Sequence, residues 1–133
     1  MAAVSLSDLA AVSLFEPLSE AELAEVAGWF EVKEVGAGVR LAGEGTTGYS
    51  FFVLSEGEAV VTAQGRSVAS LGPGDFFGEM ALLGLGRRQA TVTTASPARV
   101  LVLFGEDFGR MQAKHPEITA RLEIVMRERL EQL

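Results

Sequence analysis

The sequence predicts a mainly β fold, a β-roll or jelly-roll-like sandwich of two sheets, with helices at both ends. Between Glu31 and Phe104, short apolar runs alternate with glycine-containing turns at the spacing of an antiparallel double sheet. Before and after that segment, apolar residues recur at helical spacing. The length of 133 residues fits a single domain, with N-terminal helices in 1–30, the roll in 31–104 and C-terminal helices in 105–133.

Two helices are expected before the roll. Ser5 can cap a short helix that runs to about Val12. A longer helix over 20–29 is the stronger prediction, because Ser19 and Glu22 have the spacing of a capping box. Apolar residues then follow at helical spacing, which predicts that one face of this helix packs against a sheet.

Seven or eight short strands are expected in the roll, and the sequence places seven of them. Each is a short apolar run bounded by residues that favour turns, and most of the bounding residues are glycines. The seven expected strands cover residues 32–35, 39–42, 50–54, 58–63, 66–71, 90–94 and 99–104.

Two more helices are expected after the roll. Residues 106–114 begin with acidic side chains and end with a basic one, in agreement with the helix dipole. Pro116 suits the first turn of a second helix, which carries an apolar stripe. The stripe can serve as core, as a dimer seam or as a lid over a ligand, and its members are Ile118, Leu122, Val125, Met126, Leu130 and Leu133.

Composition excludes several functional classes. Eleven basic residues against eighteen acidic ones give a formal net charge of −7, which opposes binding to nucleic acid and to anionic membrane surfaces. The first twenty residues contain no Lys or Arg, so no signal peptide is expected. No run reaches the roughly 18 apolar residues that a membrane span requires. We therefore expect a cytoplasmic protein with no nucleic acid partner and no membrane span.

The inventory of reactive side chains is small. The chain has no cysteine, which excludes disulfides and cysteine-based catalysis, and it has one histidine, His115. A cupin-like metalloenzyme shares a similar roll but needs several histidines, so neither a catalytic nor a metal site is expected. His115 is expected between two helices, as an N-cap or a surface residue.

One segment combines glycine turns, a helix start, a carboxylate and a guanidinium. It runs from Gly72 to Leu83, and Arg88 follows five residues later. A helix that begins after Gly78 leaves several N–H groups without intrahelical partners, and these can bind a phosphate. Phosphate does not explain Glu79, which is better suited to accept a hydrogen bond from a hydroxyl group, whereas Arg88 offers a planar donor fork to phosphate oxygens.

The residues Phe77-Gly78-Glu79-Met80-Ala81-Leu82 and Arg88-Gln89-Ala90-Thr91-Val92 resemble the phosphate-binding cassette of cyclic nucleotide-binding domains, without insertion or deletion. The resemblance extends over nearly the whole chain and implies a short cassette helix and no enzymatic activity. It implies that Glu79 binds the ribose 2′-OH. The ligand-binding residues that it implies are Gly78, Glu79, Met80, Ala81, Arg88 and Gln89, with Val61 and Phe76 as candidate contacts to the base.

Two positions depart from the family pattern. Arg87 stands where the family commonly has proline, and Gln89 stands where a small residue is usual. A hydroxyl side chain at the second position is associated with a preference for guanine, and Gln89 has none. We therefore expect cAMP rather than cGMP as the ligand.

The resemblance implies a regulatory module in which ligand binding repositions the C-terminal helices. A cyclic nucleotide is the expected ligand, no cofactor is expected, and a second copy of the chain or an effector protein is the expected partner. The alternative is a β-roll that binds no nucleotide and serves in protein–protein contact or dimerisation. The sequence leaves open whether the chain acts alone or as part of a larger protein.

Overall fold

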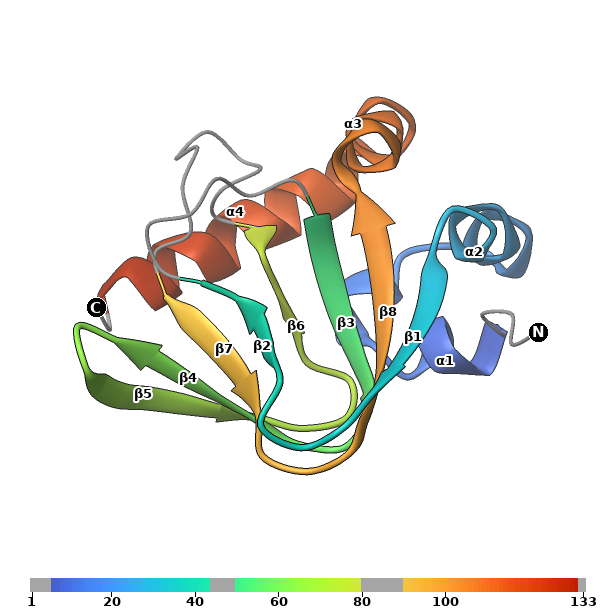
Figure 1. Cartoon of the computed structure of the whole chain (residues 1–133). Coiled ribbons are helices and arrows are strands. Elements are labelled where there is room, and N and C mark those ends of the chain that lie inside the picture. The colour runs from blue at the N-terminus through green and yellow to red at the C-terminus, as the bar shows by residue number, and fades with distance from the viewer. Residues whose placement is uncertain (1–5, 44–49, 80–89, 132–133) are drawn as a thin grey trace.

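The computed structural model describes residues 6–43, 50–79 and 90–131. Two antiparallel sheets of four strands each pack together, with helices flanking them, so the predicted mainly β double-sheet fold is confirmed (Figure 1). One sheet has the order β1 (Glu31–Val35), β8 (Ala98–Phe104), β3 (Ser50–Glu56) and β6 (Phe76–Phe77). The other has the order β2 (Arg40–Ala42), β7 (Thr91–Thr94), β4 (Ala59–Ala63) and β5 (Arg66–Leu71).

The strands β3 and β8 are buried on both faces, which explains their nearly continuous apolar sequences. Phe51 packs into a cluster with the helices, whereas Phe52 packs into the cluster between the sheets. Successive side chains of a strand point to opposite faces, so neighbouring residues of β3 join different clusters. The sheet that contains β3 is therefore the central layer of the molecule.

The helices before the roll are α1 (Leu6–Ala10), the single-turn η1 (Ser13–Phe15) and α2 (Glu20–Ala27). Both bonds of the predicted capping box are present at the start of α2. Two of these helices are shorter than predicted. Val12 is extended and buried as it leads into η1, and Phe30 is buried where the chain turns from α2 into β1. The first helix stops before Val12 because that residue is extended, and α2 stops at its C-cap residue Gly28.

The helices after the roll are α3 (Gly105–Lys114) and α4 (Pro116–Glu131), as predicted. The helix α4 runs from the α3 side of the molecule toward the β4–β5 hairpin, and the C-terminus lies at that end (Figure 1). Only the first half of its apolar stripe is core: Ile118 and Leu122 are fully buried, whereas Leu130 is 37% exposed. Arg121 also donates a hydrogen bond to the Ser13 carbonyl, which holds α4 against η1.

Candidate functional site

The two-residue strand β6 positions the candidate site. It was not among the seven strands predicted from the sequence. It pairs with β3 through Phe52 and Phe77, whose rings stack with centroids 4.8 Å apart. A turn leads into β6, where the Asp75 carboxylate accepts a hydrogen bond from the Gly72 N–H at 2.8 Å. The Gly74 N–H donates to the Leu54 carbonyl at 2.8 Å. These bonds fix the chain direction directly before Gly78.

Gly78 and Glu79 follow β6. Gly78 has a φ of 97°, a conformation that side chains with a Cβ rarely adopt, so glycine is required there for the backbone direction itself. Glu79 is only 2% exposed, which is unusual for a carboxylate because burial disfavours its charged form. A carboxylate buried to this degree needs a partner, and α4 supplies one.

Arg129 of α4 forms an ion pair with Glu79, in which Nη1 donates to Oε1. Its Nη2 donates to the Phe76 carbonyl at 2.6 Å. The guanidinium carbon also lies 5.0 Å from the centroid of the Phe76 ring, within cation–π range. One arginine of the last helix therefore contacts three groups of the segment that leads into the predicted cassette.

Phe76, Gly78 and Glu79 lie within one four-residue stretch, residues 76–79. Met80, Ala81, Arg88 and Gln89 lie outside the described residues, as does most of the predicted cassette helix. Val61 is half-buried on β4 and packs against the cluster between the sheets, whereas Phe76 packs with the helical cluster. The ligand-binding roles of all these residues stay predictions.

Two features of the structure were not found from the sequence. Arg129 was not singled out, and its one signal is its position beside Leu130, at the edge of the apolar stripe. The other is the burial of His115, which lies between α3 and α4 as expected but is only 4% exposed, so the surface alternative was wrong. The side chain of His115 is buried because α2, α3 and α4 meet around it. His115 caps the end of α3 and directly precedes α4.

The arrangement of two antiparallel sheets with flanking helices places the chain in the class of β-rolls with terminal helices. The family model described as cyclic nucleotide-binding domain matches residues 32–115. The chain belongs to this family, as the resemblance predicted. The family fold is regulatory and non-catalytic, and its ligand is a cyclic nucleotide.

Named relatives include two classes of signalling protein. The chain is 36% identical over 121 residues to a cyclic nucleotide-gated potassium channel of Rhizobium etli, which covers 91% of this chain and 34% of the channel. It is 36% identical over 110 residues to the cGMP-dependent protein kinase egl-4 of Caenorhabditis elegans, covering 77% of this chain and 14% of the kinase. The chain thus spans about a third or less of these relatives.

Among solved structures, cAMP-bound PfPKA-R superposes with a TM-score of 0.81 and 28% sequence identity, covering 92% of this chain and 45% of that one. Relatives named for cAMP and relatives named for cGMP both occur, so the family alone leaves the choice of base open. Within the described ranges, no helix combines the length and the hydropathy that crossing a bilayer requires.

Proposed function

We propose that this chain is one cyclic nucleotide sensor over its whole length and that it binds cAMP in preference to cGMP. The observation that carries the proposal is the buried Glu79 carboxylate, which follows a positive-φ glycine at the end of β6. A carboxylate kept out of water at that position is suited to accept a hydrogen bond from a ribose hydroxyl. The preference for cAMP rests on Gln89, which offers no hydroxyl to a guanine base.

The remaining contacts follow from the cassette sequence. Backbone N–H groups near Gly78 and Ala81 and the Arg88 guanidinium would bind the cyclic phosphate. Val61 and Phe76 would line the side of the site that receives the base, and Met80 and Gln89 would flank the ligand. Hydrogen bonds to charged groups contribute roughly 1.5–3 kcal/mol each, so loss of Arg88 should weaken binding at least about tenfold.

The Arg129–Glu79 ion pair connects the proposed ligand site to the last helix. An ionised carboxylate has about four acceptor sites, so Glu79 can accept a ribose hydroxyl while it holds Arg129. A ligand that changes the position or charge environment of Glu79 would then change the contact that secures the end of α4. Nucleotide binding would shift α4 between two positions, and a second copy or an effector protein would respond to this shift.

Calorimetric titration of the purified chain with cAMP and with cGMP tests the proposal. We expect cAMP to bind more tightly than cGMP, and Arg88→Ala and Glu79→Gln each to weaken cAMP binding. Arg127→Ala is the matched control, because Arg127 is an exposed arginine of α4. Absence of binding by both nucleotides would support the alternative of a protein-contact module.

A second measurement tests the movement of α4. Backbone NMR signals of 116–131 should shift when cAMP binds, and Arg129→Leu should reduce these shifts. Identical α4 signals in the presence and absence of bound nucleotide would contradict the switching part and leave the binding part intact. The cytoplasmic location and the identity of the effector stay predictions from the sequence.

A further inference from the structure

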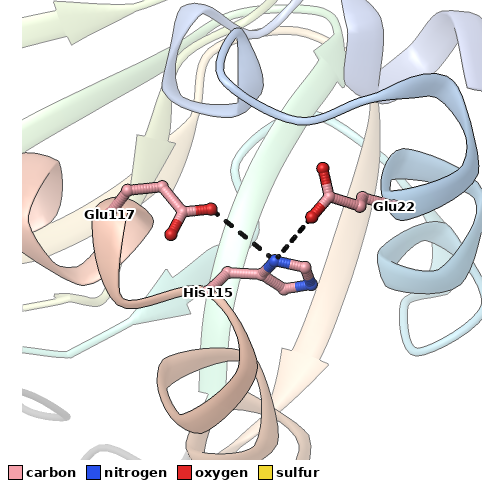
Figure 2. A group of neighbouring side chains, drawn as sticks. All are labelled: Glu22, His115 and Glu117. Atoms are coloured by element: carbon pink, nitrogen blue, oxygen red, sulfur yellow. Dashed lines mark ion pairs between the residues drawn. The ribbon is translucent and has the colours of Figure 1, made fainter.

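Three carboxylates surround the only histidine of the chain, His115, where α2, α3 and α4 meet. Glu22 of α2 and Glu117 of α4 lie on opposite sides of the imidazole, and both point toward the same ring nitrogen (Figure 2). The distance to Nδ1 is 3.7 Å from Glu22 Oε2 and 3.7 Å from Glu117 Oε1. Glu25 lies on the other side, with Oε1 3.6 Å from Nε2.

Both ring nitrogens of His115 are buried, and neither has a hydrogen-bond partner among the described residues. The carboxylate oxygens stand beyond the usual hydrogen-bond distance of about 2.7–3.2 Å. Buried polar nitrogens are rarely left without a partner, since the cost of removing them from water is then uncompensated. The imidazole is thus more than nine-tenths buried, has no hydrogen-bond partner among the described residues, and faces three carboxylates at 3.6–3.7 Å.

The separations fit a metal ion better than direct hydrogen bonds. One ligand atom each from Glu22, His115 and Glu117 lie within 4.8 Å of one another. A tetrahedral ion with bonds of about 2.0–2.1 Å holds its ligand atoms about 3.4 Å apart. The two carboxylates are 46% and 45% exposed, so their side chains have room to move toward a shared ion. We propose that Glu22, His115 and Glu117 bind a divalent transition metal ion of the zinc class.

The donor set determines the class of metal. One imidazole nitrogen with two carboxylate oxygens suits Zn²⁺, whereas Mg²⁺ and Ca²⁺ prefer ligand sets made of oxygen alone. Neighbouring residues also orient the proposed ligand side chains. Glu22 Oε1 accepts the Ser19 N–H of the capping box, and this bond turns Oε2 toward His115. Glu25 faces the other ring nitrogen, Nε2, and its Oε2 pairs with Lys114 Nζ at 3.1 Å. A metal-bound histidine usually donates its second N–H to such a carboxylate.

This site is separate from the nucleotide site. Glu117 lies in the first turn of α4 and Arg129 in its last, which places them about 18 Å apart along the helix axis at 1.5 Å per residue. A metal at the first turn would join α2 to the α3–α4 junction, because its ligands come from both. The inference therefore does not depend on nucleotide binding.

The test uses the full chain without an affinity tag and titrates it with Zn²⁺ by calorimetry. We expect one Zn²⁺ per chain, with Glu22→Gln and Glu117→Gln each weakening binding at least about tenfold. Glutamine preserves the capping box in the first variant, so α2 stays capped. Glu20→Gln is the matched control, since Glu20 is an exposed glutamate in the same first turn.

The single histidine gives a second readout, because every imidazole signal in nitrogen-15 NMR comes from His115. Zn²⁺ should shift the Nδ1 signal and leave Nε2 protonated. Coordination through Nε2, equal loss of affinity in the Glu20→Gln control, or no Zn²⁺ binding would each overturn the proposal. Binding of Mg²⁺ as tightly as Zn²⁺ would overturn the metal class, and circular dichroism of each variant confirms that it is folded.

Discussion

Arg129 and Glu79 are 50 residues apart in sequence and form an ion pair in which the carboxylate is 2% exposed and the guanidinium side chain 26% exposed. The ion pair with Glu79 therefore holds the C-terminal end of the last helix, whereas core packing holds its first half. The two anchors differ in chemistry. Ile118 and Leu122 hold the helix by apolar packing, whereas Arg129 holds it by a charged hydrogen bond to Glu79.

Arg129→Leu should lower the free energy of unfolding by about 2–3 kcal/mol. Removing one partner of a buried pair usually costs 3–5 kcal/mol, and the partial exposure of Arg129 reduces that cost. Adding Glu79→Leu to the same chain should recover most of the loss, since no unpaired charge is then buried. Urea unfolding of the single and double variants measures the coupling, with Arg127→Leu as the control. Additive losses in the double variant would contradict the pairing.

Gly57→Ala should destabilise the roll by about 3 kcal/mol or more. Gly57 has a φ of 92°, and an added Cβ would lie 2.5 Å from the Pro97 carbonyl oxygen, so both strain and a backbone clash result. Gly65 separates the two effects, because it has a φ of 77° but nothing within 4 Å of an added Cβ. Gly65→Ala should cost only about 1–2 kcal/mol. Equal losses in urea unfolding would show that the clash contributes nothing.

Thr94→Val should cost about 1–3 kcal/mol, although it preserves the shape of the side chain. The Thr94 hydroxyl, on a side chain only 2% exposed, donates to the Gly36 carbonyl at 2.7 Å and accepts from the Val39 N–H at 2.8 Å. Valine would remove both hydrogen bonds from the turn between β1 and β2, each of which contributes about 0.5–1.5 kcal/mol. Thr93→Val is the control on the same strand, since Thr93 is half-buried. We expect its free energy of unfolding to change by less than about 0.5 kcal/mol.

The features that the sequence revealed depend on nearby residues. The capping box joins Ser19 to Glu22, three positions apart, and Pro116 begins α4 because its own ring suits a first turn. The strands β3 and β8 were recognisable because burial on both faces makes their sequences apolar throughout. These signals lie within short stretches of the chain, so most of the helices and strands were predictable.

The features that the sequence did not reveal depend on how distant elements meet. The strand β6 has only two residues, too few for a pattern, and it exists because it pairs with β3. Arg129 reaches Glu79 only because α4 crosses the molecule toward β6, and no periodicity encodes that direction. His115 is buried because three helices converge on it. Residue type alone gave His115 no reason to be inside.

The stabilising effect of Glu22 should disappear in acid. Hydrogen bonds from the Ser19 backbone N–H, and then those with the Ser19 side chain, lower the pKa of Glu22 below its ordinary value of 4.5. A carboxyl whose pKa is lower in the folded chain contributes stability above its unfolded pKa and loses it as the pH falls through the folded pKa. Glu22→Gln retains the capping geometry but cannot ionise. Wild type should therefore exceed this variant in free energy of unfolding near neutral pH, and the difference should shrink as the pH falls below the ordinary carboxyl pKa of 4.5.

Urea unfolding in the presence of a chelator measures this difference without any contribution from bound metal. Glu20→Gln, in the same first turn but outside the capping box, separates the capping bond from the general charge of α2. A difference between wild type and Glu22→Gln that stays constant from neutral to acid pH would contradict the prediction. The same series also tests the metal site: a gain in stability with added Zn²⁺ that is larger in wild type than in Glu22→Gln would support Glu22 as a metal ligand.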